Sequence, residues 1–327
     1  MHLPSVAVLL PTLDEAASID ACLASLALQD YAGMWEVVIA DGGSADDTRV
    51  LAEAWKNRLD LRVIDNPDRV QSEGLWLAAQ VTDAEIFVRA DAHTTYAPDY
   101  ISRSVQVLAE TGATAVGGPM VPHSASAFGQ SVARMMRSPL GIGPGAFHRS
   151  GKRREVDTVY LGAFRRDRFL ALGGMRTLPS RVAEDADFYW RMRREGGTVV
   201  LDPTIGSSYR PRESWPGLWR QFFRYGRGKA DMLFVNGVWP SWRPLAPLLL
   251  VLGLLEGLVL GSLAIWWPLW ALLGLWCAVV LLVAGRGRPL DALVAATMQL
   301  AYGSGLLTGL FRMPARVRSQ VVSRSAP

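Results

Sequence analysis

Cysteine is scarce in this chain, with Cys22 and Cys277 the only two among 327 residues. Two cysteines cannot build the disulfide framework of a small secreted domain, so that class of protein is excluded. The sequence also opens without a signal peptide, because no basic segment precedes the apolar run from Val6 to Leu10, which is itself too short for one. We therefore expect the first part of the chain to work in the reducing cytoplasm.

Two nucleotide-binding fingerprints are missing as well. The turn after the first apolar run reads Thr12-Leu13-Asp14-Glu15 instead of G-x-G-x-x-G, and the chain contains no G-x-x-x-x-G-K-[ST] segment. Without these glycine-rich phosphate-binding turns, a dinucleotide-dependent oxidoreductase and a P-loop nucleotidase both lose their main support.

Charge is nearly absent from one stretch, where Glu256 is the only charged side chain between Pro244 and Gly285. The residues before this stretch mix charged and apolar positions, as a globular domain does. We therefore predict a catalytic domain over residues 1–230 and a helical membrane module over residues 231–327. The hydrophobic segments of the module are expected at about 245–265, 269–284 and 293–311, followed by a basic C-terminal tail. The first segment has the roughly 20 residues that a membrane span requires.

The net charge of +4 and the pI near 9.3 would suit a nucleic-acid-binding protein. Many of the arginines, however, follow Arg210 and lie beside the hydrophobic segments. A negatively charged lipid surface explains that placement better, so we expect anionic membrane lipids and no nucleic acid as partners.

The segment 214–228 places Trp215, Leu218 and Trp219 on one helical face, which predicts a helix lying in the headgroup region. A plain core helix is the alternative. Three full spans that start in the cytoplasm would leave Arg312 and the arginines after it outside, against the positive-inside tendency. We therefore favour two spans and an interfacial third helix.

The first 230 residues read as an α/β fold. Four short, apolar and β-branched runs have the composition of buried strands, at residues 5–11, 35–40, 61–64 and 84–90. Helical spacing appears between the first two runs, in Ile19, Cys22, Leu23 and Leu26. This alternation of strands and helices predicts a mostly parallel sheet built from βαβ units.

Acidic residues follow three of these strands, with Glu15 after the first, Asp41 after the second and Asp91 after the fourth. The carboxyl ends of parallel strands meet at one crevice, so these side chains are expected to lie close together. An acidic site needs a metal ion to bind an anionic nucleotide, and Asp91 with His93 would suit Mg²⁺ or Mn²⁺. On these two residues alone, ordinary turn positions are an equally good interpretation.

Four segments resemble, in their order and spacing, the motifs of the family 2 inverting glycosyltransferases. They are Pro11 to Glu15, Asp41 to Thr48, Asp91 to His93, and Glu184 to Asp187 with Arg191 beyond them. The resemblance extends over about Val6 to Lys229 and implies a GT-A type nucleotide-diphospho-sugar transferase domain.

The resemblance also implies roles for individual residues. The donor would be held by Pro11, Thr12, Glu15, Asp41, Arg69 and Asp91. Asp91 and His93 would hold the divalent metal. Here the chain departs from the family, because its third motif ends in histidine rather than aspartate, and the choice between Mn²⁺ and Mg²⁺ stays open.

Asp185, paired with Glu184, matches the family's general base, which removes the proton of the acceptor hydroxyl so that one displacement inverts the anomeric configuration. Without the resemblance, these two residues would be read as charges that complement a helix dipole. Gln221, Arg224 and Tyr225 resemble the family's Q-x-x-R-W signature, which lines the acceptor side.

Further segments resemble the succinoglycan biosynthesis branch of bacterial polysaccharide glucosyltransferases. They are Asn66-Pro67, Val156 to Val159, Tyr209 to Arg212 and Gln221 to Ala230. This likeness implies transfer of a hexose, glucose from UDP-glucose, to a polyprenyl-diphosphate-linked oligosaccharide. The enzyme would be a multi-pass protein of the bacterial inner membrane with a cytoplasmic catalytic domain. A polyprenyl-phosphate monosaccharide synthase and a non-catalytic nucleotide-binding membrane scaffold stay open as alternatives.

Overall fold

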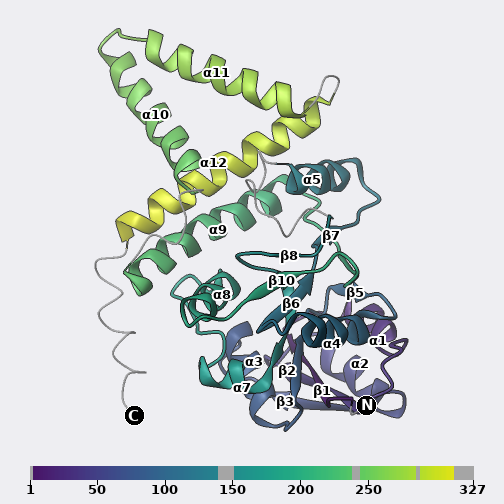
Figure 1. Cartoon of the computed structure of the whole chain (residues 1–327). Coiled ribbons are helices and arrows are strands. Elements are labelled where there is room, and N and C mark those ends of the chain that lie inside the picture. Colours follow the sequence, from purple (N-terminus) through teal and green to yellow (C-terminus); the bar gives the residue numbers. More distant parts are fainter. Residues whose placement is uncertain (1–2, 139–150, 238–243, 285–287, 313–327) are drawn as a thin grey trace. The chain divides into compact units, whose positions relative to one another are not determined.

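The computed structural model describes residues 3–138, 151–237, 244–284 and 288–312. These residues form two compact units that alternate along the chain. The first, called here the sheet unit, comprises Met1–Pro122, Ala146–Thr177 and Glu184–Arg210. The second, called the helical unit, comprises His123–Gly145, Leu178–Ala183 and Pro211–Pro327. Figure 1 labels most of the helices and strands of both units.

Four parallel strands form one half of the main sheet, in the order β3-β2-β1-β4. They are β1 (Val6–Thr12), β2 (Trp35–Asp41), β3 (Leu61–Asp65) and β4 (Ile86–Arg89). Every residue of β1 is buried, because helices cover both faces of the sheet. A strand covered on both faces is apolar throughout, which explains why this one was readable from the sequence.

The other half of the sheet is mixed and continues in the order β4-β9-β6-β10-β8. Its strands are β6 (Ala115–Gly118), β8 (Arg154–Glu155), β9 (Tyr160–Arg165) and β10 (Val199–Leu201). Strand β9 runs antiparallel to both of its neighbours, β4 and β6. A small second sheet joins β5 (Thr94–Tyr96), β7 (Val121–Pro122) and β11 (Ser207–Tyr209). The prediction of a mostly parallel α/β sheet is confirmed.

Two hydrophobic cores flank the sheet. On one face lie α1 (Ile19–Leu26), α2 (Thr48–Ala54), the short 3₁₀ helix η1 (Trp55–Asn57) and α4 (Tyr100–Thr111). On the other lie α3 (Gln71–Gln80), α7 (Arg166–Ala171) and α8 (Glu184–Arg194). Alternate residues of β1 enter opposite cores, so that Val8 packs with Leu23 of α1 while Leu9 packs with Leu75 of α3.

The helical unit contains five described helices. They are α5 (Ala127–Arg137), α9 (Trp215–Asn236), α10 (Leu245–Ser262), α11 (Trp267–Ala284) and α12 (Pro289–Arg312). Ser214 is the N-cap of α9, and its hydroxyl accepts a hydrogen bond from the backbone N–H of Gly217. It continues to Asn236, beyond the expected end near residue 228, because Gly226 and Gly228 fit close packing partners there.

Helices α9 and α12 pack with their backbones almost touching. A Cβ atom added at Gly226 would collide with the carbonyl oxygen of Tyr302, and one at Gly305 would collide with that of Phe223. Glycine at these positions therefore allows an approach that no other residue permits.

Two of the described helices, α10 and α12, are long and apolar enough to cross a membrane by length and composition. The apolar stretch Trp267–Leu281 of α11 is shorter. Of the most apolar 18-residue stretch in each helix, 44% is buried in α12 but only 28% in α10. The two helices therefore have different surroundings within the unit.

Candidate active site

The carboxyl ends of β1, β2 and β4 lie at one edge of the sheet. Thr12 of β1 pairs with Asp41 of β2 at the end of the two strands. On the other side of β1, its pairing with β4 ends at Leu9 and Arg89. The Thr12 hydroxyl donates to the Asp41 carboxylate over 3.3 Å. The loops that carry the predicted donor residues are therefore neighbours in space, as the strand pattern implied.

Asp41 is buried, and its carboxylate is held from within its own loop. The Ser44 hydroxyl donates to Asp41 Oδ1 over 2.6 Å, and the Ser44 backbone N–H donates to Oδ2 over 3.2 Å. Asp14, in the left-handed region at φ 53°, accepts from the backbone N–H of Ala45 over 2.8 Å. The loops after β1 and β2 are thus hydrogen-bonded to each other at the carboxyl ends of the strands. These two loops together are called the shelf.

Glu15 lies on this shelf, next to His93. The Glu15 backbone N–H donates to the Thr48 hydroxyl over 2.7 Å, and Ser18 donates to Glu15 Oε2 over 2.7 Å. The other carboxylate oxygen, Oε1, lies 3.1 Å from His93 Nδ1. A residue predicted to bind the donor and one predicted to bind the metal are therefore in direct contact.

Asp91 is almost completely buried, and three residues that the sequence did not single out hold it. Its Oδ1 accepts from Gln71 Nε2 over 3.1 Å and from Arg89 Nη2 over 3.3 Å. Its backbone N–H donates to the Tyr96 hydroxyl over 2.8 Å, and that hydroxyl donates to the Asp91 carbonyl over 3.2 Å. Of these three partners, only Arg89 could have been found from the sequence, because it lies two residues before Asp91 at the end of an apolar strand.

Arg89 connects this carboxylate electrostatically with a second one. Burial by itself lowers the pKa of Arg89, but the charges of Asp91 and Asp185 raise it, and the net pKa lies above its ordinary value. The guanidinium is therefore a permanent cation. Asp91 and Asp185, from distant parts of the sequence, both lie within the electrostatic range of this one buried charge.

The acidic residues of α8 differ in their surroundings. Asp187 is fully buried and accepts from Arg176 over 2.6 and 2.8 Å and from Arg191 over 2.9 Å. Glu184 is buried, whereas Asp185 is half-buried in the first turn. Asp187 therefore anchors the helix, whereas Asp185 stays partly accessible to solvent.

Arg69 lies exposed at the same edge of the sheet, in the left-handed region at φ 54°. Its backbone N–H donates to the Asn66 carbonyl over 3.0 Å. A Cβ atom added at Gly42 would lie 3.5 Å from the Arg69 Cα, so the loops after β2 and β3 are adjacent. Pro11, which was also predicted to bind the donor, is buried near the carboxyl end of β1, one residue before Thr12.

The site residues fit a divalent metal that is shared with a nucleotide. His93 is 47% exposed and Asp91 lies two residues before it. No cluster of three or more His, Cys, Asp or Glu side chains suited to a metal occurs among the residues that the structure describes. Mg²⁺ and similar ions are commonly held by one or two protein ligands together with substrate phosphates, and a carboxylate with an imidazole, as in Asp91 and His93, is chemically a donor set of that kind.

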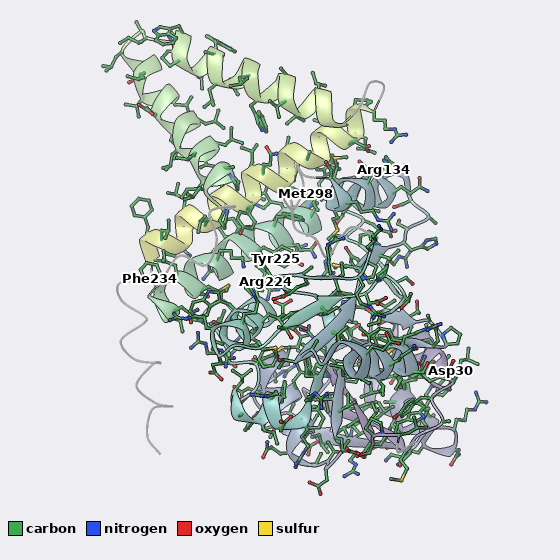
Figure 2. The ribbon with its side chains drawn as sticks, in the orientation of Figure 1. Asp30, Arg134, Arg224, Tyr225, Phe234 and Met298 are labelled. Atoms are coloured by element: carbon green, nitrogen blue, oxygen red, sulfur yellow. The ribbon has the colours of Figure 1, made fainter. Side chains whose placement is uncertain are left out.

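The predicted acceptor-side residues lie in the helical unit, on α9. Gln221 Nε2 donates to the Tyr225 hydroxyl over 2.9 Å, and Arg224 Nη2 donates to the Arg181 carbonyl over 3.3 Å. Figure 2 labels Arg224 and Tyr225 on this helix. Asp231, further along α9, accepts from the Ser180 backbone N–H over 2.6 Å. Helix α9 thus holds the segment 178–183, which ends one residue before Glu184.

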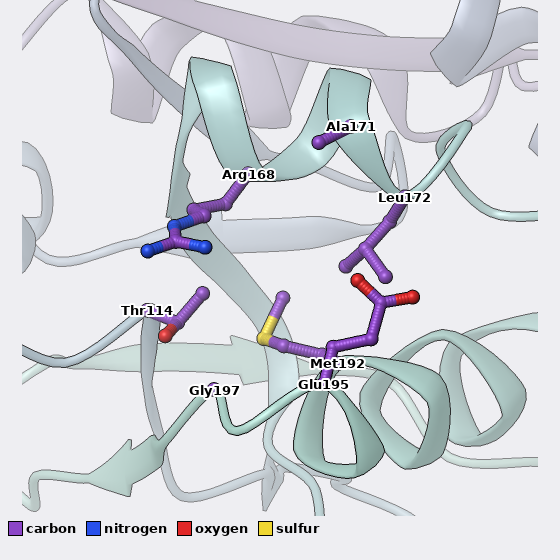
Figure 3. Close-up of a pocket in the computed structure, with 7 residues that line it drawn as sticks. All are labelled: Thr114, Arg168, Ala171, Leu172, Met192, Glu195 and Gly197. Carbon is purple, nitrogen blue, oxygen red and sulfur yellow. The ribbon is translucent and has the colours of Figure 1, made fainter.

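A separate pocket lies at the opposite edge of the sheet. Its lining, shown in Figure 3, consists of Thr114, Arg168, Ala171, Leu172, Met192, Glu195 and Gly197. Thr114 and Gly197 precede β6 and β10, so they lie at the amino ends of these strands. This pocket is therefore not part of the acidic edge, and we assign it no role in the chemistry.

The sheet topology and the acidic edge define the class of protein, a nucleotide-diphospho-sugar transferase domain of the GT-A fold. Residues 7–172 match the model of glycosyl transferase family 2, and the chain belongs to this family. The assignment made from the four sequence motifs is confirmed.

Several known proteins are similar over most of the chain. Succinoglycan biosynthesis protein ExoA of Rhizobium meliloti (strain 1021) is 32% identical over 325 residues, which cover 95% of this chain and 96% of that protein. The likeness to the succinoglycan branch is thereby confirmed. A dolichyl N-acetyl-alpha-D-glucosaminyl phosphate 3-beta-D-2,3-diacetamido-2,3-dideoxy-beta-D-glucuronosyltransferase of Methanococcus voltae is 23% identical and covers 72% of this chain and 76% of its own.

Among solved structures, the mannosyltransferase PcManGT from Pyrobaculum calidifontis, in complex with GDP-Man and Mn²⁺, has a TM-score of 0.61. It is 20% identical and covers 95% of this chain and 88% of its own. At this identity the likeness establishes the fold only. The roles of individual site residues remain predictions.

Proposed function

We propose that this protein is an inverting hexosyltransferase of polysaccharide biosynthesis that transfers glucose from UDP-glucose to a polyprenyl-diphosphate-linked oligosaccharide. The observation that carries the proposal is the pair Asp91 and Asp185, two carboxylates from different elements within range of the buried Arg89. A base and a donor-binding carboxylate in the same part of the molecule are what a single displacement needs. The similarity to ExoA supports the role in polysaccharide biosynthesis.

Asp185 acts as the general base in this mechanism. Its carboxylate takes the proton of the acceptor hydroxyl while the hydroxyl oxygen attacks the anomeric carbon. The bond from that carbon to the diphosphate oxygen breaks, and its electron pair leaves with the nucleoside diphosphate. Because attack and departure occur on opposite sides, the anomeric configuration inverts.

The donor lies on the shelf formed by the loops after β1 and β2. We assign the nucleoside to Pro11, Thr12, Glu15, Asp41 and Arg69, which the structure brings to one edge. Asp91 and His93 would hold the divalent ion, Mn²⁺ or Mg²⁺, which stabilises the negative charge that develops on the leaving diphosphate. The GDP-Man and Mn²⁺ of the mannosyltransferase PcManGT complex support a donor and metal of these classes.

We assign residues 1–230 to catalysis and residues 231–327 to attachment at the bacterial inner membrane, with the catalytic part in the cytoplasm. Helix α9 would lie among anionic headgroups, since its exposed Trp215 and Trp219 accompany Arg220. Gln221, Arg224 and Tyr225 on the same helix would face the lipid-linked acceptor, and the acceptor class is supported by the dolichyl-phosphate-linked relative.

A donor and acceptor screen tests this function. Purified protein in detergent is incubated with UDP-glucose, UDP-galactose, UDP-N-acetylglucosamine or GDP-mannose, with Mn²⁺, Mg²⁺ or EDTA. We expect UDP release and a product one hexose longer with UDP-glucose, a lipid-diphosphate oligosaccharide and a metal. Transfer to polyprenyl phosphate alone would identify the monosaccharide synthase instead. UDP binding without turnover on any acceptor would identify the scaffold.

A further inference from the structure

We propose that α10 and α11 form a hairpin that crosses the bilayer twice, and that α12 lies at the membrane surface beside α9 without crossing. The chain then returns to the side on which the catalytic part lies. This topology rests on the membrane attachment proposed above, and it specifies which surface the lipid covers.

The hairpin presents a broad apolar surface that the described residues of the chain leave uncovered. Many of the large apolar side chains on its two helices are at least 39% exposed, among them Leu249, Leu252, Leu255, Leu258, Val259, Trp270, Leu275, Val279 and Leu281. Contiguous apolar surface of this kind is rare on water-exposed proteins and marks a lipid or protein contact. The helices touch each other through Gly257, where an added Cβ would lie 2.9 Å from the Leu269 side chain.

The lengths of the two helices match a bilayer. Each of α10 and α11 has 18 residues. At about 1.5 Å per residue each extends about 27 Å, close to the roughly 30 Å of the hydrocarbon core. A surface of this length favours the bilayer over a protein partner, because a protein interface needs no such match.

The turn at the tip of the hairpin satisfies its own backbone. The Ala264 N–H donates to the Gly261 carbonyl and the Ile265 N–H to the Leu260 carbonyl, each over 2.9 Å, with Ala264 left-handed at φ 63°. These two hydrogen bonds satisfy the backbone N–H groups of Ala264 and Ile265 without water.

Exposed tryptophans mark the depth that the tip reaches. Trp266, Trp267 and Trp270 are 46%, 74% and 64% exposed. Tryptophan prefers the headgroup interface, so the tip reaches the far interface instead of stopping in the hydrocarbon. Glu256, the hairpin's charged residue, lies six residues before the end of α10, toward that interface.

Positive charge is confined to the base of the hairpin in the sequence. Arg243 precedes α10, Arg286 and Arg288 follow α11, and the tip Leu263–Trp266 carries no charge. Loops rich in arginine stay in the cytoplasm, so both ends of the hairpin lie on the cytoplasmic side.

Helix α12 is held against a helix that cannot enter the hydrocarbon. Its partner α9 carries Arg220, Arg224, Arg227, Lys229 and Asp231 within 22 residues. Glycines of both helices bring the two backbones together, as described above for Gly226 and Gly305. Helix α12 therefore remains at the depth of α9.

The start of α12 is tied to a second polar helix. Asp291 is fully buried and accepts from Ser131 Oγ over 2.6 Å and from Arg134 over 2.6 and 2.8 Å, both on α5. Figure 2 labels Arg134 on α5. Helix α12 is thus fixed by polar partners near its start and along its length, and Arg312 at its end stays on the cytoplasmic side.

Single-cysteine labelling in sealed membranes tests this topology. In a Cys22→Ala, Cys277→Ala background, one cysteine is introduced at Met34 in the sheet unit, at Trp267 or Leu263 at the tip, or at Pro327. A membrane-impermeant maleimide is then applied to spheroplasts and to inverted vesicles. We expect M34C and P327C to react only in inverted vesicles, and W267C and L263C only in spheroplasts.

A fifth protein, Cys22→Ala with native Cys277, reports on what covers the hairpin. Cys277 is exposed near the middle of α11 and is expected to react only after detergent is added. Reaction of P327C from the outside would show that α12 crosses, and reaction of the tip cysteines from the inside would show that the hairpin does not. A detergent-free soluble dimer would show that a second copy covers the surface.

Each of these outcomes is independent of the transferase chemistry. Sidedness is read from labelling and needs no turnover, so an inactive protein with the expected labelling would overturn the proposed function alone. An active protein with P327C outside would overturn this topology alone. A single symmetric peak in size-exclusion chromatography of the detergent-solubilised variant serves as the check that it has folded.

Discussion

Two neighbouring carboxylates on α8, Asp185 and Asp187, are predicted to respond in opposite ways to the same Asp→Asn change. The Asp187 side chain is fully buried and makes three charge-assisted hydrogen bonds of 2.6 to 2.9 Å with Arg176 and Arg191. Asparagine at this position would keep one acceptor oxygen, but it would turn an amide group toward guanidinium donors and leave buried positive charge uncompensated.

Removing one partner of a buried ion pair costs about 3 to 5 kcal/mol. The lower end applies to Asp187→Asn, because Arg191 keeps its hydrogen bonds to the carbonyls of Leu172 and Gly174, at 2.6 and 2.7 Å. A loss of about 3 kcal/mol lowers the Tm of a unit of this size by about 6 to 12 °C. Asp185→Asn acts on a half-buried side chain and is expected to cost less than about 1 kcal/mol.

Activity should show the reverse pattern. Loss of a general base lowers kcat by about 10²- to 10⁴-fold, so Asp185→Asn is expected to abolish most UDP release while UDP binding stays within about twofold. Asp187→Asn, measured below its Tm, should retain a larger share of kcat. Thermal unfolding and steady-state UDP release in the same detergent check both variants.

Turnover of Asp185→Asn within a few-fold of the unchanged protein would remove Asp185 as the base. An unchanged Tm for Asp187→Asn would show that its two arginine partners do not anchor α8. Equal losses of Tm in both variants would show that the two carboxylates share one structural role.

Three further predictions follow from other contacts. Gln71→Ala removes a donor to Asp91 and is expected to weaken Mn²⁺ affinity in the presence of UDP by about 10- to 100-fold, measured by calorimetry; unchanged affinity would contradict the metal assignment. Gly305→Ala should destabilise the α9–α12 packing by about 1 to 3 kcal/mol in mixed-micelle unfolding. Gly274→Ala, where no described atom beyond its own helix turn lies within 4 Å of an added Cβ, should be neutral or stabilising. A destabilisation by Gly274→Ala equal to that by Gly305→Ala would refute the close approach of α9 and α12. Burial opposes ionisation of Asp202, but hydrogen bonds from Thr204 and Arg153 hold its pKa below the ordinary value. The stability that ionised Asp202 contributes is present above the unfolded pKa of about 3.9 and is lost as pH falls through the folded pKa. In urea titrations, Asp202→Asn should therefore lose less stability between about pH 5 and 3 than the unchanged protein. An equally steep loss of stability with falling pH in both proteins would contradict this role of Asp202.

The parallel half of the sheet was readable from the sequence because burial on both faces leaves an unbroken apolar run, as in β1. The antiparallel β9 was not placed, because strand order depends on pairing between segments far apart in the chain. Its position between β4 and β6 became visible only in the folded sheet.

The length of α9 illustrates another limit of sequence patterns. The apolar residues at helical spacing predicted a helix over 214–228 only, and Gly226 and Gly228 each lower helix propensity by about 1 kcal/mol. In the folded chain Gly226 lies against α12 and Gly228 against Val182, so packing outweighs propensity and the helix continues to Asn236. Propensity is local, whereas the compensating contact lies about 80 residues further along the chain.

The sequence alone determined the family, the acidic residues that follow the strands, and the apolar segments near the C-terminus. Each of these depends on short-range order: a strand's composition, a motif's spacing, a run without charge. Tertiary structure decided which groups support them. Gln71 beside Asp91, and the different surroundings of Asp185 and Asp187, arise from contacts between elements, and no local pattern encodes the partner that a side chain meets after folding.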